Sequence, residues 1–201
     1  LGTTYWPLSR SAPLLDQGDV GRCTGWSAVN CMNTTTYYGE RRKLNRGRTL
    51  GPVHGDNLYH RATELDIWPG VWPPQDTGSS GLAVAKALKE SGYISEYRHA
   101  FGIDHLLDAL MLGPVLVGTT WLEDMFYPAK TGEVSVSGQP LGGHEYLCNY
   151  VNLGRYDRLG FVTSWGRWGK DGTGRFFIPI EKFDGLLRDD GDVTILVGSV
   201  M

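Results

Sequence analysis

The stretch Leu14–Asn30, LLDQGDVGRCTGWSAVN, places a single cysteine where a glycine-rich turn passes into a predicted helix. Apolar residues recur at three- and four-residue steps from Thr24 to Tyr38, which predicts a mostly buried helix that begins near Cys23 and ends at Gly39. A thiol at a helix N-terminus lies beside unpaired backbone N–H groups, which lower its pKa and favour the reactive thiolate. Free cysteines are also commonly buried as small apolar residues. This segment alone leaves Cys23 evenly balanced between a nucleophile and a core residue.

The composition is that of a folded globular domain. The chain has 201 residues, of which 41% are hydrophobic and 20% are charged. A formal net charge of -3 predicts no general attraction to nucleic acid or to an anionic membrane surface. No apolar run reaches the roughly 18 residues that span a bilayer. The chain begins at Leu1 rather than methionine, so a processed or trimmed N-terminus is expected, and the compartment is undetermined.

Three further helices are predicted in the first half of the chain. They are expected at 55–65, from Ser79 or Ser80 to Gly92, and at 103–113. Short side chains that accept hydrogen bonds from free backbone N–H groups favour helix starts. The expected N-caps are therefore Asp56, one of the two serines, and Asp104.

The second half of the chain predicts strands. Four short apolar or alternating runs, divided by glycine-rich turns, lie at 114–121, 144–152, 158–165 and 174–180. The fold class is therefore predicted as α+β, with a helical lobe over about 14–105 and a β-rich lobe over about 106–201. Cys31 and Cys148 are expected in the core, and Cys148 on the same side of its strand as His144.

A thiol nucleophile needs a base, and one of the five histidines is distinctive. His144 follows the sequence LGG and opens a predicted strand, so another segment can approach its ring closely. Ordinary solvated or capping roles suffice for the others, which are His54, His60, His99 and His105.

Four stretches, taken in order along the chain, resemble the papain-like cysteine peptidases. They are DQGDVGRC, DTGSSGLAVAKALKESGY, the pair GPVLVGTTW and LGGHEYLCNYV, and TSWGRWGKDGTGRFFI. The resemblance implies a two-lobe fold with the active cleft between a helical lobe and a β-barrel-like lobe, and residues 1–13 packed on the latter. It makes Gln17 the oxyanion-hole glutamine, Cys23 the nucleophile and His144 the acid and base. By the same resemblance Trp165 shields the contact between His144 and Thr163, and Gly143 lines the substrate cleft.

The departures from the family pattern are specific. Val20 replaces a cysteine that usually forms a disulfide, so that disulfide is expected to be absent, and Arg22 and Thr24 replace the residues on either side of Cys23. Thr163 stands in place of the asparagine that orients the catalytic imidazole. Its hydroxyl can also accept a hydrogen bond from the ring.

Acidic residues near the expected cleft have open interpretations. Glu145 replaces a small residue of the family, and a basic substrate side chain and a position turned away from the cleft are equally supported. The run RDDGD lacks the ligand spacing of a calcium loop, so Asp189, Asp190 and Asp192 are predicted to form a surface turn.

The predicted function is thiol endopeptidase activity through a Cys23 thioester. One alternative is a degenerate domain that acts as a binding or structural component of a larger assembly, and another is a cell-wall peptide amidase that uses the same cysteine and histidine. No metal and no organic cofactor are predicted. The expected partners are a peptide or protein substrate and a propeptide or parent-chain segment, with no nucleic acid and no membrane span.

Overall fold

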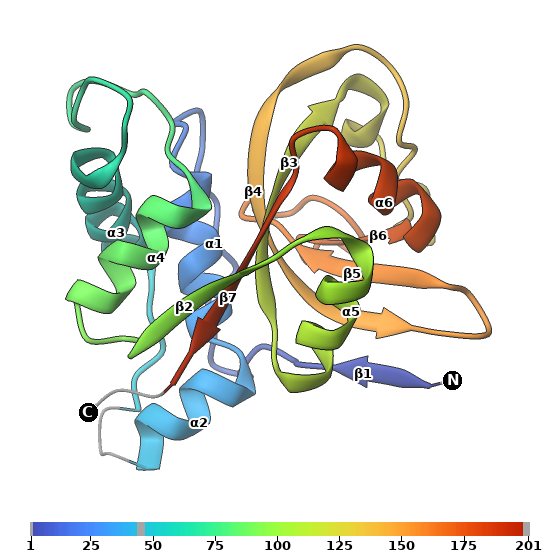
Figure 1. Cartoon of the computed structure of the whole chain (residues 1–201), viewed down its shortest axis with the longest axis horizontal. Coiled ribbons are helices and arrows are strands. Elements are labelled where there is room, and N and C mark those ends of the chain that lie inside the picture. The colour runs from blue at the N-terminus through green and yellow to red at the C-terminus, as the bar shows by residue number, and fades with distance from the viewer. Residues whose placement is uncertain (1, 44–46, 199–201) are drawn as a thin grey trace.

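The computed structural model describes residues 2–43 and 47–198, in which α-helices pack against a sheet (Figure 1). The helices are α1 (Cys23–Met32), α2 (Thr35–Lys43), α3 (Pro52–Leu65), α4 (Gly81–Glu90), α5 (Gly102–Leu112) and α6 (Ile180–Arg188), with a 3-10 turn η1 (Glu123–Phe126). The strands are β1 (Thr3–Tyr5), β2 (Glu96–Ala100), β3 (Val115–Leu122), β4 (Pro140–Asn152), β5 (Arg158–Val162), β6 (Arg175–Pro179) and β7 (Asp192–Val197). The predicted α+β class is confirmed.

The described strands form one antiparallel sheet in the order β2-β7-β3-β4-β5-β6, with β1 paired to β4. Strands β2 and β6 end this order, so the sheet is open rather than closed into the expected barrel-like form. Strand β2 precedes the predicted lobe boundary yet pairs with β7. The division of the chain at about residue 105 stays a prediction.

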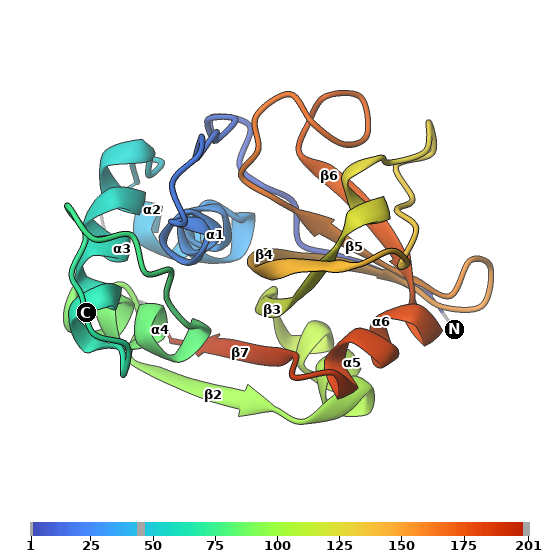
Figure 2. The ribbon, with the colours of Figure 1, turned by 90° about the horizontal axis from the view of Figure 1, so that it is seen from above.

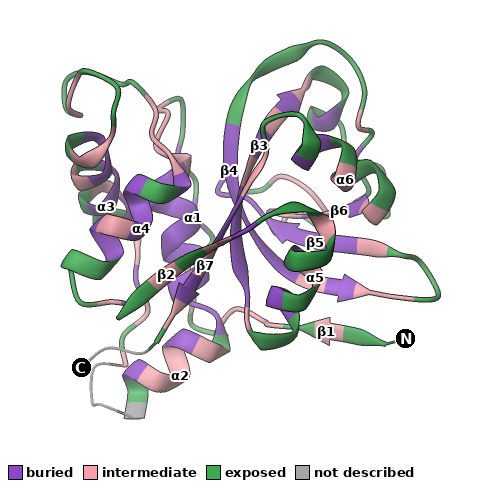
Figure 3. Ribbon diagram, viewed as in Figure 1, coloured by how far each residue is buried: buried purple, intermediate pink, exposed green. Residues whose placement is uncertain are grey.

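Both faces of the central strands are buried, and each face belongs to a different core. On β3, Leu116 packs with helices α1, α3 and α4, whereas Val115 and Val117 pack with α5 and α6. Figure 2 shows α5 and α6 on the far side of β3 and β4 from α1. Successive strand residues point to opposite faces, so the alternation assigns each residue to one core. Helix α1 and the middle of β4 are accordingly among the most buried parts of the fold (Figure 3).

The predicted helix over Thr24–Tyr38 is wrong in extent, because two helices occupy that segment. Helix α1 begins at Cys23 as predicted but ends at Met32, and α2 begins at Thr35. Between them the Asn33 amide exchanges two hydrogen bonds with the backbone of Leu50, at 2.8 and 2.9 Å. This long-range contact ends α1.

Capping was predicted correctly at one helix and wrongly at two. Ser80 caps α4, since its hydroxyl accepts a hydrogen bond from the N–H of Ala83. Helix α3 instead begins at Pro52, a favoured first position for proline, and the Asp56 carboxylate accepts hydrogen bonds from Arg22 and Trp26. Helix α5 begins at Gly102, so Asp104 lies inside its first turn.

Helices α1 and α3 cross at a point where neither has a side chain. A Cβ atom on Gly25 would lie 2.3 Å from the Gly55 carbonyl oxygen and 2.7 Å from the Tyr59 nitrogen. A Cβ atom on Gly55 would lie 2.8 Å from the ring of Trp26. These two glycines therefore allow a close backbone approach that holds α1, and with it Cys23, against α3.

Within residues 2–43 and 47–198, none of the helices combines the length and apolarity needed to cross a bilayer.

Candidate active site

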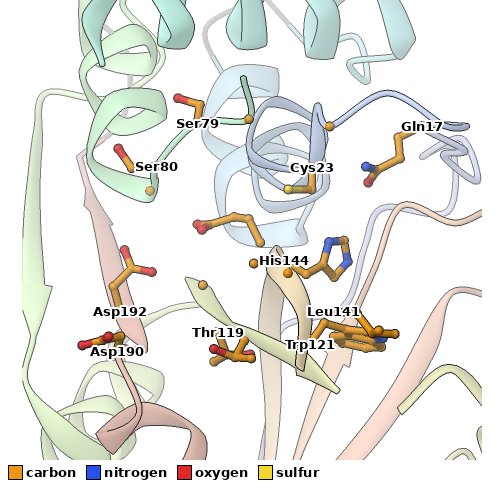
Figure 4. A pocket seen from close by; sticks show the side chains of 18 of the residues that line it. Gln17, Cys23, Ser79, Ser80, Thr119, Trp121, Leu141, His144, Asp190 and Asp192 are labelled. Atoms are coloured by element: carbon orange, nitrogen blue, oxygen red, sulfur yellow. The ribbon is translucent and has the colours of Figure 1, made fainter. Parts of the chain in front are cut away.

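A cavity of about 750 Å³ lies between the N-termini of α1 and α4 on one side and strands β3 and β4 on the other. The cavity is lined by six of the seven residues expected at the site, which are Gln17, Cys23, Gly143, His144, Glu145 and Trp165. Thr163 does not line this cavity but contacts His144 directly. Figure 4 shows Gln17, Cys23 and His144 around the same side of the cavity.

Cys23 is the first residue of α1, and the side chain of Arg22 before it makes no cap hydrogen bond to the helix. The free N–H groups of the first turn therefore lie beside the thiol, where they favour negative charge. Burial raises the pKa of the Cys23 thiol to about 12; a backbone hydrogen bond from Glu145 opposes this shift, whereas the charge of the Glu145 side chain adds to it. Removal from water thus favours the neutral thiol.

His144 is fixed by contacts on three sides. Its Nε2 atom is hydrogen-bonded to the Thr163 hydroxyl at 2.7 Å. The Trp165 ring stacks on the imidazole with centroids 4.3 Å apart, and the Trp121 ring meets it edge-on at 5.2 Å. These aromatic rings exclude water, and burial lowers the pKa of His144 to about 3. The bond to Nε2 leaves Nδ1 as the nitrogen that is available for proton transfer.

Gln17 is held in place by residues that were not predicted for the site. The Ser164 hydroxyl donates to Gln17 Oε1 at 2.7 Å, and Gln17 Nε2 donates to the Val20 carbonyl at 3.1 Å. The Gln17 N–H also donates to the Ser164 carbonyl, and the Gly166 N–H donates to the Leu15 carbonyl. An amide nitrogen carries two protons, so one Nε2 proton remains for a developing oxyanion.

The burial of Cys23 and that of His144 both oppose charge separation within the pair. Among the described residues, no hydrogen bond joins the Cys23 sulfur to the His144 ring. Ionised together, the thiolate and the imidazolium would act as counterions, and the N-terminus of α1 would add to the attraction. The geometry therefore provides the two groups of a thiolate–imidazolium pair. The pair forms if the proton lies on His144, and it does not form if the proton stays on Cys23.

No family model matches the sequence, and no curated protein is recognisably similar to it. Xylellain, a cysteine protease from Xylella fastidiosa, is similar in structure with a TM-score of 0.75, at 17% identity over 100% of this chain and 87% of its own. The Carica candamarcensis cysteine protease CMS1MS2, in complex with E-64, gives 0.62 at 13% identity over 99% of both chains. Procathepsin L 3 of the Tenebrio molitor larval midgut gives 0.66 at 16% identity, over 98% of this chain and 70% of its own.

This chain has the papain-like fold. Arg22, the residue before Cys23, makes contacts that its place in the sequence does not indicate. Arg22 Nε donates to the Gln17 carbonyl at 2.9 Å, and Nη1 donates to Asp56 at 2.9 Å. Its guanidinium also lies 4.7 Å from the centre of the Trp26 ring. Arg22 therefore ties the Gln17 turn to α3 in this variant of the papain-like fold.

Three acidic residues line the cleft, and the sequence expectation differs for two of them. The Glu145 carboxylate lines the cavity from β4, although His144 beside it points to the opposite face of the strand. The run RDDGD is not only a surface turn, because Asp190 and Asp192 both line the cavity. Nothing in the local sequence of 188–192 indicates this, since the contact depends on the pairing of β7 with β3.

Proposed function

We propose that the chain is a papain-like thiol endopeptidase with Cys23 as nucleophile and His144 as acid and base. The observation that carries the proposal is the convergence of Gln17, Cys23 and His144 on one cavity, with Thr163 bonded to the far nitrogen of the ring. An oxyanion donor, a nucleophile and a base must lie together for catalysis, and Gln17, Cys23 and His144 meet at this open cleft in that way. The papain-like fold supports the same class of reaction.

In the proposed reaction the Cys23 thiolate attacks the carbonyl carbon of a peptide bond, and the carbonyl oxygen takes the negative charge. The free Nε2 proton of Gln17 and the N–H of Cys23 stabilise this oxyanion. His144 then protonates the leaving amine, so that a thioester to Cys23 remains. The neutral imidazole next accepts a proton from water as the water attacks the thioester, and the carboxylic product leaves.

A degenerate domain is the second candidate, and two observations favour it. Burial raises the pKa of Cys23 to about 12 and lowers that of His144 to about 3, so each group by itself prefers its neutral form. Thr163 also has a shorter side chain than the asparagine it replaces. A binding or structural role in a larger assembly would need no ion pair.

Alkylation by the epoxide E-64 across pH separates the two candidates. If the ion pair forms, the labelling rate of Cys23 is expected to be nearly constant from about pH 5 to 8, because the thiolate is present well below the ordinary thiol pKa. If Cys23 is a lone buried thiol, labelling is expected to be negligible at neutral pH and to rise about tenfold per pH unit. Intact-mass analysis gives the rates.

The His144→Ala variant is the control for this measurement. It keeps Cys23 at the start of α1 but removes the base, so it is expected to convert a flat profile into the rising one. A folded wild-type protein that already follows the rising profile would refute the endopeptidase proposal and support the degenerate domain.

Thr163 is proposed as the positioning residue for the His144 ring. In the imidazolium both nitrogens carry protons, so Nε2 donates to the Thr163 hydroxyl, and Thr163→Val leaves that buried donor unpaired. We expect kcat/KM to fall about 10- to 100-fold. The alkaline limb of the pH profile should move to lower pH, because loss of this hydrogen bond destabilises the imidazolium, which must keep its proton in the active ion pair.

Thr163→Ser is the matched variant for this prediction, since it restores the hydroxyl and removes one methyl group. It should recover most of the rate and the original alkaline limb in pH-dependent kinetics of a fluorogenic peptide. A Thr163→Val enzyme with an unmoved alkaline limb would show that the hydroxyl does not stabilise the protonated ring.

Partners follow from the same proposal. The substrate is a peptide or a protein, and a propeptide or parent-chain segment is proposed because the chain spans 70% of the procathepsin that it resembles in structure. None of the described residues forms a group of three or more metal-ligating side chains.

A further inference from the structure

Three carboxylates line the part of the cavity beside α4. Figure 4 shows Asp190 and Asp192 on the side away from Gln17, below Ser80 at the start of α4. Glu145 reaches the same region from β4. A Cβ atom on Gly118 would lie 2.3 Å from Asp192 Oδ1 and 2.7 Å from Glu145 Oε2. The carboxylates of Asp192 and Glu145 therefore approach the same point beside Gly118.

The opposite wall of this region is also a glycine. A Cβ atom on Gly81 would lie 2.7 Å from Asp192 Oδ2 and 3.1 Å from Glu145 Oε1. The carboxylates thus lie between α4 and β3, and any side chain on either glycine would collide with them. The lack of two side chains here allows both carboxylates to approach so closely.

The Glu145 carboxyl group is buried with one oxygen unpaired. The residue is only 4% exposed, and its Oε1 atom has no hydrogen-bond partner. Burial, with the nearby charge of Asp192, raises the pKa of the Glu145 carboxyl well above its usual range. A buried carboxylate without a donor is costly, and a cation with N–H groups would relieve that cost.

No positive side chain fills this role among the described residues that line the cavity. They include Glu145, Asp190 and Asp192 but no lysine and no arginine. The charge of His99 lowers the pKa of Asp192, although burial raises it more, and the His99 ring does not line the cavity. The cavity therefore has an acidic end with room for a ligand.

We propose that this acidic end, defined by Glu145 and Asp192, binds the arginine or lysine side chain of a peptide substrate. This inference rests on the proposed endopeptidase function and adds the substrate class. The cavity that holds Cys23 and His144 also holds Glu145, so a bound peptide would present its side chain and its scissile bond to one continuous space. A guanidinium has five N–H donors in a fixed plane and can bridge both carboxylates.

Apolar and acidic substrate side chains would fit this end poorly. An apolar group would leave the buried Oε1 atom of Glu145 without a hydrogen-bond donor, and an acidic group would add a further negative charge beside Glu145 and Asp192. Selection of a cation would therefore come from attraction to Glu145 and Asp192 and also from exclusion of the alternatives.

A positional library of fluorogenic peptides tests the inference. At one peptide position we expect kcat/KM for arginine or lysine to exceed that for glutamine or leucine by at least tenfold, which corresponds to about 1.4 kcal/mol. The ratio of arginine to glutamine at that position should fall at least tenfold in Glu145→Gln, and also in Asp192→Asn. The exposed Asp189→Asn change removes a charge three residues from Asp192 without lining the cavity and should leave the ratio unchanged.

A binding measurement keeps the inference testable without catalysis. In the Cys23→Ala protein, calorimetric titration should give a lower Kd for the best arginine peptide than for its glutamine counterpart, and Glu145→Gln added to this variant should abolish the difference. Equal Kd values would overturn the inference even in an active enzyme. Cleavage of neutral peptides without a cationic preference would overturn it while leaving the endopeptidase proposal intact, whereas a flat binding preference with no E-64 labelling would overturn both.

Discussion

Replacement of Cys23 by alanine is expected to lower kcat/KM for any cleaved peptide by about 10⁴-fold or more and to remove labelling by E-64. In the proposed mechanism the Cys23 sulfur forms the thioester, so its removal removes the nucleophile. The described residues contain two further cysteines, and both Cys31 and Cys148 are fully buried in the cores. Burial raises the pKa of each of these thiols far above its usual range.

Cys31→Ala provides the matched control, because Cys31 lies on the same helix eight residues after Cys23. This variant should keep the wild-type rate and take up one equivalent of E-64. Rates are measured with the best peptide of the positional library, and circular dichroism establishes that each variant is folded. If Cys23→Ala retained more than about a tenth of the wild-type rate, the thioester mechanism would be wrong.

The second large effect concerns stability. Gly25→Ala is expected to lower the free energy of unfolding by about 3 kcal/mol or more, since the new methyl group would lie 2.3 Å from the Gly55 carbonyl oxygen. The colliding atoms are backbone atoms of α3, so no side-chain rotation relieves the contact. Helices α1 and α3 must move apart, and the burial of Trp26 and Leu58 between them would suffer.

Gly39→Ala is the control for that prediction. Gly39 also lies in a helix, α2, but a Cβ atom there would meet no atom within 4 Å. Alanine has the higher helix propensity, so this change should stabilise the protein by up to about 1 kcal/mol. Urea unfolding followed by fluorescence measures both. Equal stabilities for the two variants would show that α1 and α3 are not in the close contact described.

Much of the fold was predictable from local patterns. The runs that became β3, β4, β5 and β6 are apolar and bounded by turn residues, and Ser80 followed by an apolar helix predicts α4. Strand β7 was not predicted although its sequence DVTILV is rich in β-branched residues, and helix α6 was missed as well. Strand β2 has the sequence EYRHA, in which only Ala100 is buried, and it is defined by its pairing with β7, which lies almost a hundred residues later in the chain.

Some residues of the candidate site could be predicted from the sequence and others could not. Gln17, Cys23 and His144 stand in recognisable local motifs, whereas Ser164 and Asp192 do not. Ser164 meets Gln17 across 147 residues of sequence, and the approach of Asp192 to Glu145 depends on the register of β7 beside β3. Side-chain roles that arise only from strand register or from a contact between distant segments cannot be read from one sequence.

The hydrogen bonds that join Leu15–Gln17 to Ser164–Gly166 support the proposed catalytic residues but not the acidic end of the cavity. The proposed oxyanion donor, the residues around the His144 ring and the turn before Cys23 are connected through this short set of hydrogen bonds. The acidic end instead depends on Gly81, Gly118 and two strands that take no part in these hydrogen bonds. Under the proposed function, a substitution of Asp192 would therefore change the preferred peptide while leaving these hydrogen bonds intact. A substitution of Glu145 would also act on Cys23, because the charge of Glu145 raises the pKa of that thiol.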